Sequence, residues 1–205
     1  GLGIGAVLRR GPVEDVIVTK DGTLLKDLKP GSVVGTGSLR RELQIKKINP
    51  LIRVKLIRGN VQTRLRKLEE GQYDAIVLAA AGLKRLGLED RISQYFEPEE
   101  IIPAAGQGIL AVQGRQDEGY GYLSGYDNLA SRYEALCERA FVRFLDGGCS
   151  SPVAAYAQVD GETIRLQGLY WDETGWEIDE IRGSVTDAEE LGITLARTMA
   201  ARRGK

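Results

Sequence analysis

The feature that most constrains the fold is an alternation of short apolar segments with short helical patterns in the first half of the chain. Apolar segments typical of strands occupy residues 32–36, 52–57 and 73–79, and helical patterns follow them at 39–48, 61–70 and 82–86. Ser38 is a candidate N-cap for the first of these helices, and Asn49-Pro50 ends it. Strands that alternate with helices form βαβ units, whose strands run parallel. We therefore expect an α/β domain with a parallel sheet.

The pattern changes toward the C-terminus. Strands are predicted at 1–8, 16–19 and 109–112, a flexible linker at 116–125, a helix at about 128–145, and strands at 154–159, 163–169 and 177–182. Asp160-Gly161 separates two of these strands and is a strong hairpin signal. Thr186-Asp187-Ala188-Glu189 forms a capping box, which predicts a last helix to about residue 202. This part is expected to be a small α+β domain with a three-stranded antiparallel sheet.

Basic side chains are concentrated in the α/β part. From Thr36 to Arg91 the chain has thirteen Lys and Arg against six Asp and Glu, although the net charge of the whole chain is −1. Arginines follow the predicted strands at positions 40, 41, 58, 64 and 85. The carboxyl ends of parallel strands form one edge of a sheet, and ligands bind there. Arginine recognises carboxylate and phosphate with two parallel hydrogen bonds.

These observations predict an anionic ligand in a cleft lined by Arg40, Arg41, Arg58, Arg64 and Arg85. The backbone amides at the starts of the helices would add anion sites. Lys46, Lys47, Arg66 and Lys67 are instead expected to lie on solvated helix faces. Nucleic acid is less favoured as the ligand, because aromatic residues such as Tyr73 and Tyr95 are few in this region and base stacking would have little to use.

The reactive side chains are few. The chain has no histidine, which excludes histidine-ligated zinc and His-based triads. Cys137 falls beside the apolar stripe of the 128–145 helix and is predicted to be a core residue. Cys149 directly follows Gly147-Gly148, a pattern that ends a helix and displays the next side chain on a turn. Two interpretations of Cys149 stay open at this point: an inert small residue or an exposed functional thiol.

The beginning of the chain and the absence of targeting signals lead to two expectations. Gly1 to Leu8 resembles the middle of a buried strand, so sequence before Gly1 is expected to be lost or to belong to another chain. The sequence contains no apolar run of membrane-spanning length and no signal peptide, so a cytoplasmic location without membrane contact is the default.

Several motifs together resemble the porphobilinogen deaminase (hydroxymethylbilane synthase) family. They are Val34-Gly35-Thr36-Gly37-Ser38-Leu39-Arg40-Arg41, the segments 56–65 and 74–88, Pro103-Ala104-Ala105-Gly106-Gln107-Gly108, Glu138-Arg139-Ala140-Phe141 and Gly147-Gly148-Cys149. They occur in family order over nearly the whole chain. The resemblance implies a three-domain enzyme that joins four porphobilinogen molecules head to tail, with loss of ammonia, to give hydroxymethylbilane.

The resemblance also assigns roles to residues. A dipyrromethane cofactor would be attached to Cys149 through a thioether, with Ser38, Arg40, Arg41 and Arg64 holding the cofactor. Arg58, Arg64, Arg85 and Gln107 would hold the carboxylates of substrate and of the linear pyrrole intermediates. The family's catalytic aspartate would precede Gly1, so no catalytic residue is assigned and the chain alone is expected to be inactive. No metal is implied, and the protein is expected to be a monomer apart from an N-terminal companion fragment.

The expected fold combines doubly wound, periplasmic-binding-protein-like lobes with the small C-terminal domain. Residues 1–12 and 103–124 would be a remnant of the first domain with hinge segments, 13–102 the arginine-rich second domain, and 125–205 the domain that carries the cofactor cysteine. Three short segments depart from the family pattern: Gly37, Ser150-Ser151-Pro152 and 111–115. Two alternatives remain: a non-catalytic anion-binding module with the same lobes, and an inactive remnant that keeps only the fold.

Overall fold

A computed structural model describes residues 1–116, 118–145, 152–172 and 175–203. The described chain divides into two compact units. Residues 12–103 form the first, called here the arginine-rich unit. The described residues of 1–11, 104–145 and 153–203 form the second, called here the split unit because the other unit is inserted into its sequence.

The arginine-rich unit is built on a five-stranded sheet of order β4-β3-β5-β2-β6. Its strands are β2 (Asp15–Thr19), β3 (Val33–Gly35), β4 (Arg53–Lys55), β5 (Ala75–Ala79) and β6 (Gln94–Phe96). β3 pairs in parallel with both β4 and β5, as the helix–strand alternation predicts. β2 runs antiparallel between β5 and β6, so the sheet is mixed and not parallel throughout. No helical pattern precedes β2, so the alternation that sets the direction of the later strands does not apply to it.

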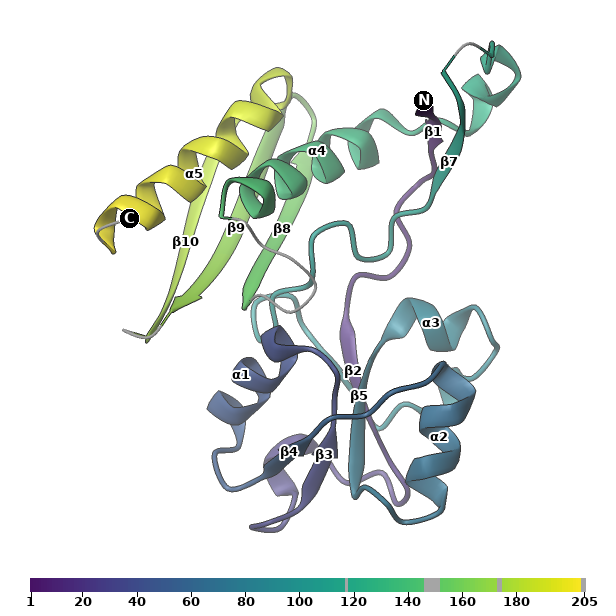
Figure 1. The fold of residues 1–205 in the computed structure, drawn as a ribbon, viewed down its shortest axis with the longest axis vertical. Coiled ribbons are helices and arrows are strands. Elements are labelled where there is room, and N and C mark those ends of the chain that lie inside the picture. Colours follow the sequence, from purple (N-terminus) through teal and green to yellow (C-terminus); the bar gives the residue numbers. More distant parts are fainter. Residues whose placement is uncertain (117, 146–151, 173–174, 204–205) are drawn as a thin grey trace. The chain divides into compact units, whose positions relative to one another are not determined.

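Helices cover both faces of this sheet (Figure 1). α1 (Leu39–Ile48) packs on one face, where alternate residues of β2 and β5 such as Ile17 and Val77 join Ile45 in one core cluster. α2 (Val61–Glu69) and α3 (Ala80–Lys84) cover the other face, against Val16 and Ile76. Short 3-10 turns, η1 (Leu25–Asp27) and η2 (Glu89–Arg91), complete the unit.

The starts of α1 and α2 are set by local capping. The Oγ of Ser38 accepts a hydrogen bond from the amide of Arg41 at 3.4 Å, and the Oδ1 of Asn60 accepts one from the amide of Thr63 at 2.8 Å. Such caps satisfy amides that have no partner inside the helix. The predicted bounds and N-cap of α1 are confirmed.

In the split unit, β1 (Leu2–Val7) and β7 (Ala111–Arg115) form an antiparallel pair. A 3-10 helix, η3 (Gly121–Tyr126), follows where the sequence predicts a flexible linker at 116–125. The reason is Tyr120: its ring packs over Gly114, where a Cβ would lie 2.0 Å from the tyrosine oxygen, and its hydroxyl donates to the carbonyl of Arg115 at 2.8 Å. The linker prediction is therefore wrong for this segment.

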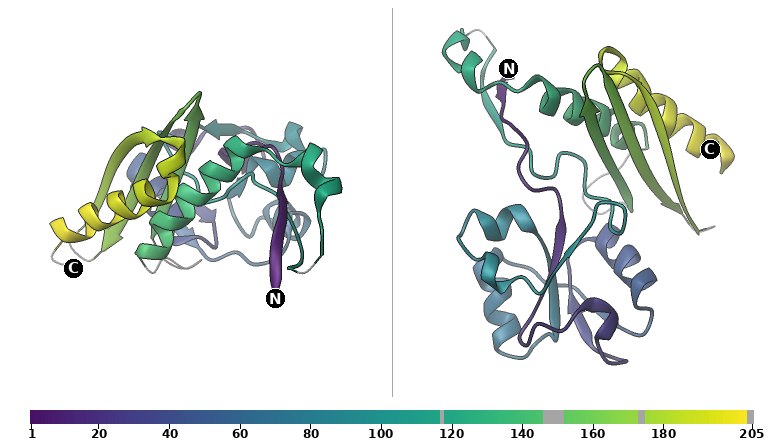
Figure 2. Two further views of the ribbon diagram at one scale, coloured as in Figure 1. Left: turned by 90° about the horizontal axis from the view of Figure 1, so that it is seen from above. Right: turned by 180° about the vertical axis from the view of Figure 1, so that it is seen from behind.

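The rest of the split unit is an α+β layer, as expected. β8 (Val153–Asp160), β9 (Thr163–Asp172) and β10 (Gly175–Ser184) form an antiparallel sheet of order β10-β9-β8, and the hairpin at Asp160-Gly161 is confirmed. Figures 1 and 2 show α4 (Leu129–Phe144) and α5 (Ala188–Arg202) across one face of this sheet. The capping-box prediction is wrong, because Ser184 accepts from the amide of Thr186 and caps a 3-10 turn, η4 (Val185–Asp187), instead.

α5 packs tightly against α4 at Gly192, and this contact gives a first test of the packing. A Cβ at Gly192 would lie 2.3 Å from the backbone oxygen of Cys137, so the helices must separate to accept one. We expect Gly192→Ala to lower the free energy of unfolding by about 1–3 kcal/mol, the usual cost of overpacking. This reverses the gain of about 0.5–1 kcal/mol that alanine normally brings to a helix interior.

Urea unfolding followed by tryptophan fluorescence measures this effect, because both tryptophans, Trp171 and Trp176, lie in β9 and β10. Gly125→Ala is the matched control, since a Cβ at that position would meet no atom within 4 Å. Equal stability of the two variants would contradict the packing described for α4 and α5.

Candidate anion-binding site

The arginine-rich unit places three arginines of two helices at one edge of its sheet. α1 follows β3, and α2 follows β4, so the amino ends of both helices lie at the carboxyl ends of parallel strands. Arg40 and Arg41 stand in the first turn of α1, and Arg64 stands in the first turn of α2. Helix amino ends attract anions through their free amides and their dipole.

Asp15 lies at the same edge because β2 is antiparallel. It is the first residue of β2 and pairs with Ala79, the last residue of β5. Its carboxylate is completely buried and bonds both arginines of α1. Oδ2 accepts from a terminal nitrogen of Arg40 at 2.7 Å, and Oδ1 accepts from Nε and a terminal nitrogen of Arg41 at 3.0 and 2.8 Å.

The side chain of Arg40 is held inside the protein. It is 4% exposed, and the nitrogen that meets Asp15 also donates to the carbonyl of Ile102 at 2.7 Å. Gln44, one turn further along α1, bonds both the amide and the carbonyl of Ile102. Arg40 thus joins β2, α1 and the segment that ends the arginine-rich unit.

The charges of this cluster do not cancel. Burial raises the pKa of Asp15, but the charges and hydrogen bonds of Arg40 and Arg41 outweigh burial and bring the pKa below its ordinary value. Burial lowers the pKa of Arg40, opposed by Asp15, yet a guanidinium remains protonated. One carboxylate therefore faces two guanidinium groups, and one positive charge is left over.

Arg64 adds a second positive charge beside the first. Its pKa is lowered by partial burial and by the positive charge of Arg41, so the two guanidinium groups are close enough to repel each other. Its Nε donates to the carbonyl of Gly59 at 2.8 Å. Within the described ranges no carboxylate forms an ion pair with Arg64. Arg41 and Arg64 together form a site with a net positive charge, suited to a carboxylate or phosphate.

The other residues predicted for the site are more scattered. Arg58 is exposed, and the carbonyl of Arg58 accepts from Nζ of Lys67 at 3.0 Å. Arg85 is exposed and borders a depression of about 270 Å³ at the amino end of α2, next to α3. Gln107 belongs to the split unit. The structure thus brings Ser38, Arg40, Arg41 and Arg64 together, while Arg58 and Arg85 make no described bond to them.

The structure describes only one of the two cysteines. Cys137 is completely buried in the core of the split unit, as predicted. Burial, and secondarily the charge of Glu138, raise its thiol pKa to about 12, which makes it unreactive at neutral pH. Cys149, the predicted attachment point, lies outside the described residues.

The described residues offer no candidate metal centre. They contain no cluster of three or more His, Cys, Asp or Glu side chains that could hold a metal ion. No helix among them is both long and apolar enough to cross a membrane.

Sequence reasoning missed Asp15 in this site. The available signal was weak: two adjacent acids, Glu14-Asp15, directly before the apolar segment Val16-Ile17-Val18. If this strand were parallel to the others, Asp15 would lie at the opposite edge of the sheet from the arginines.

Two family models match the chain. Residues 1–120 match the one described as "Porphobilinogen deaminase, dipyromethane cofactor binding domain", and residues 132–201 match "Porphobilinogen deaminase, C-terminal domain".

Curated relatives named porphobilinogen deaminase are similar over nearly the whole chain. The relative from Ruminiclostridium josui is 47% identical over 193 residues, which cover 93% of this chain and 64% of that protein. The relative from Ruminiclostridium cellulolyticum is 45% identical, over 98% of this chain and 69% of its own length. The relative from Roseiflexus sp. is 43% identical, over 98% of this chain and 68% of its own length. The chain therefore spans about two thirds of the length of these relatives.

Proposed function

Because this chain belongs to the porphobilinogen deaminase family, we propose that it is the middle and C-terminal part of a hydroxymethylbilane synthase. The complete enzyme would join four porphobilinogen molecules head to tail, with loss of ammonia, in tetrapyrrole biosynthesis. The observation that carries this proposal is the positively charged pair of Arg41 and Arg64 beside buried Asp15.

The substrate chemistry fits this pair. Each pyrrole ring of porphobilinogen carries an acetate and a propionate, so the product is a string of carboxylates. Guanidinium groups bind carboxylates through paired, charge-assisted hydrogen bonds. Arg64 has terminal nitrogens that meet no carboxylate among the described residues, and Asp15 holds Arg41 from one side only. Both can therefore receive an incoming carboxylate without first breaking an ion pair of their own.

We propose Cys149 as the attachment point of the dipyrromethane cofactor, with Ser38, Arg40, Arg41 and Arg64 around the cofactor's carboxylates. When bound, this group supplies the pyrrole to which the first substrate unit is joined. Two observations support the fit: the family model over residues 1–120 describes a cofactor binding domain, and the chain's other thiol, Cys137, is buried and unreactive. Arg40→Ala or Arg41→Ala would prevent cofactor loading.

Arg58, Arg85 and Gln107 are proposed to hold substrate and the lengthening product. For Arg85 the support is its place beside the amino end of α2, where free amides add to its charge.

Several predictions about the whole protein also remain proposals. We propose that residues 1–12 and 103–124 belong to the first domain and its hinges, that 13–102 is the second domain, and that 125–205 is the third. The sheet order β4-β3-β5-β2-β6, with one antiparallel strand and helices on both faces, supports a periplasmic-binding-protein-like lobe. We also propose that the protein is a cytoplasmic monomer and that it needs an N-terminal companion fragment for activity. A non-catalytic anion-binding module is not favoured, because both family models and the curated relatives are deaminases.

The test compares two arginines of one helix in a complete enzyme, made by combining this chain with the part of the R. josui deaminase that it does not cover. Arg64→Gln is expected to raise the KM for porphobilinogen about 10-fold or more, because a charge-assisted pair contributes about 1.5–3 kcal/mol. Arg66→Gln removes the same charge from an exposed side chain that pairs only with Glu70 among the described residues, and its KM is expected to stay unchanged. Equal KM values for the two variants would refute the proposed site.

A further inference from the structure

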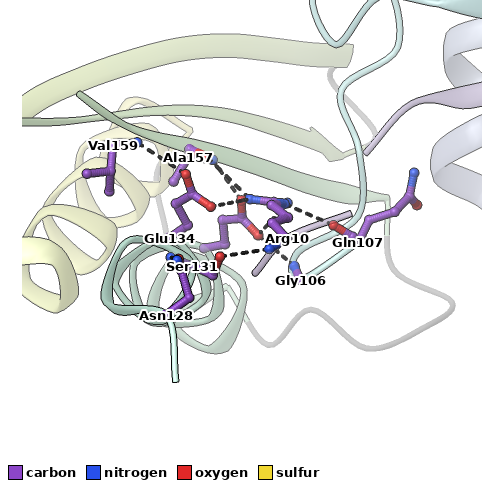
Figure 3. A network of polar contacts seen from close by, with 9 residues as sticks. Arg10, Gly106, Gln107, Asn128, Ser131, Glu134, Ala157 and Val159 are labelled. Atoms are coloured by element: carbon purple, nitrogen blue, oxygen red, sulfur yellow. Dashed lines mark hydrogen bonds and ion pairs between the residues drawn. The ribbon is translucent and has the colours of Figure 1, made fainter. Parts of the chain in front are cut away.

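Arg10 lies at the centre of the polar network in Figure 3. It forms a buried ion pair with Glu138. The side chain of Glu138, on α4, is 0% exposed. Its Oε1 accepts from a terminal nitrogen of Arg10 at 2.6 Å and from the amide of Ala157 on β8 at 2.8 Å. Its Oε2 accepts from the other terminal nitrogen of Arg10 at 3.3 Å and from the amide of Gly106 at 2.6 Å. Both oxygens of this carboxylate therefore accept two hydrogen bonds each.

Arg10 spreads its contacts in the same way. Its Nε donates to the carbonyl of Gln107 at 3.0 Å, and its backbone amide donates to Oγ of Ser131 on α4 at 2.9 Å. A terminal nitrogen also lies 3.5 Å from a carboxylate oxygen of Glu134, and the guanidinium stacks over the ring of Tyr156. The pair therefore ties two loop segments, 8–11 and 104–110, to one helix and one strand.

These two segments are the places where the chain leaves the split unit and returns to it. The boundaries between the units fall between residues 11 and 12 and between 103 and 104. Within the split unit the segments run beside each other: the amide of Leu8 donates to the carbonyl of Leu110, and the amide of Gly11 donates to that of Gly108, each at 2.9 Å. Arg10 and Glu138 stand beside both connections.

The 104–108 segment needs such support to keep one shape. Gly106 and Gly108 have positive φ angles of 75° and 81°. Glycine enters this region freely but can also adopt many other backbone conformations. Only a few turn bonds hold the segment internally, such as the amide of Gln107 to the carbonyl of Ala104 at 2.9 Å. The bonds to Glu138 and Arg10 fix the backbone on both sides of the Gly106–Gln107 peptide bond.

A buried ion pair is weak evidence for a purely stabilising role, since apolar residues of similar volume are often at least as stable. What such a pair does provide is a fixed geometry, because a bidentate pair with all its hydrogen bonds satisfied allows only one arrangement of the groups around it. In Figure 3 the side-chain amide of Gln107 extends away from the network, while the backbone of Gln107 is held by it.

We propose that Arg10 and Glu138 are positioning residues, which fix the 104–108 turn so that Gln107 presents its side-chain amide to a carboxylate of the substrate. This inference rests on the proposed function, in which Gln107 contacts substrate.

The turn is tested first, on this chain alone, by hydrogen exchange. In Glu138→Gln the new side-chain NH₂ group replaces one of two oxygens that each accept from a backbone amide, so the bond from Gly106 or the bond from Ala157 is lost. In Arg10→Lys the bond from Nε to Gln107 is lost. We expect the amides of residues 106–109 to exchange about 10-fold faster or more in Arg10→Lys, and either these amides or that of Ala157 to do so in Glu138→Gln, while the amides of β9 keep their protection. Arg10→Lys keeps the charge and is the milder variant, should Glu138→Gln unfold. Arg132→Lys, which changes the partly exposed pair of Arg132 with Asp127, is the matched control and leaves the turn unchanged. Unchanged exchange at 106–109 in folded Arg10→Lys overturns the proposal.

The link to substrate is tested by a double-mutant cycle in the complete enzyme. Gln107→Ala and Arg10→Lys are each expected to raise the KM for porphobilinogen several-fold with little change in kcat, and the double variant is expected to be no worse than Gln107→Ala alone. Additive effects on KM overturn the positioning role even where exchange has changed. An unchanged KM in Gln107→Ala overturns the role of Gln107 in substrate binding, and with it the positioning for substrate. In that case the hydrogen-exchange result still tests whether Arg10 and Glu138 hold the turn. The KM comparison of the Arg64 and Arg66 variants still tests the proposed function.

Discussion

Asp15→Asn is expected to lower the free energy of unfolding of the arginine-rich unit by about 3–5 kcal/mol, the usual cost of removing one partner from a buried ion pair. The change keeps the size of the side chain but leaves Arg40 and Arg41 side by side without a counter-charge. Urea unfolding followed by far-ultraviolet circular dichroism measures the effect. Asp90→Asn, at an exposed position in η2, is the control and should change stability by no more than about 0.5 kcal/mol.

The loss of unfolding free energy caused by Asp15→Asn is expected to depend on pH. The folded-state pKa of Asp15 lies below its ordinary value of 3.8. A carboxyl group with a lowered pKa contributes its stability above the unfolded-state pKa and loses it as the pH falls through the folded-state value. The difference between the original protein and Asp15→Asn should therefore be constant from neutral pH to about pH 5 and should shrink below about pH 4. A difference that grows on acidification would mean that Asp15 is not the ionised partner of the two arginines.

Cys149→Ser is expected to abolish activity in the complete enzyme, because the oxygen of serine is a far weaker nucleophile than a thiolate and would not form the covalent link to the cofactor. Cys137→Ser should keep full activity per folded molecule, since that thiol is buried in the split-unit core. It should instead lower the free energy of unfolding by about 1–3 kcal/mol, because a hydroxyl is placed in an apolar site. Turnover of porphobilinogen and a urea titration separate the two effects. Loss of turnover in Cys137→Ser at full stability would contradict the assignment of the cysteines.

What the sequence predicts well is what local signals decide. The bounds of α1 are confirmed because Ser38 and Asn49-Pro50 mark its two ends within the chain itself. The hairpin of β8 and β9 is confirmed because a two-residue turn fixes its register. The capping box at 186–189 failed because Ser184, two residues upstream, caps the amide of Thr186 and starts a 3-10 turn there.

What the sequence could not give depends on contacts between distant residues. The direction of β2 is set by its place between β5 and β6, and that direction decides that Asp15 meets Arg40 and Arg41, which lie 25 and 26 positions away. The burial of Arg40 likewise depends on contacts with residues that are distant in the sequence. From its position in the first turn of α1, Arg40 looked equivalent to Arg41, yet it is Arg40 that reaches the carbonyl of Ile102.

The proposed positioning pair illustrates the same limit. Arg10 precedes a turn, and Glu138 begins the Glu138-Arg139-Ala140-Phe141 motif of a long helix, but neither local pattern indicates that the two residues pair. Their 2.6 Å contact spans 128 positions of sequence. Only the three-dimensional arrangement shows that the two residues hold the segment that carries Gln107.

The most direct test of the account is the mass of this chain after production together with the part of the R. josui relative that it does not cover. We predict an intact mass that exceeds the sequence mass by one dipyrromethane unit, with the excess located by peptide mapping on the peptide that contains Cys149. A folded, assembled protein whose Cys149 peptide has its unmodified mass would contradict the central claim that this chain is the cofactor-carrying part of a porphobilinogen deaminase.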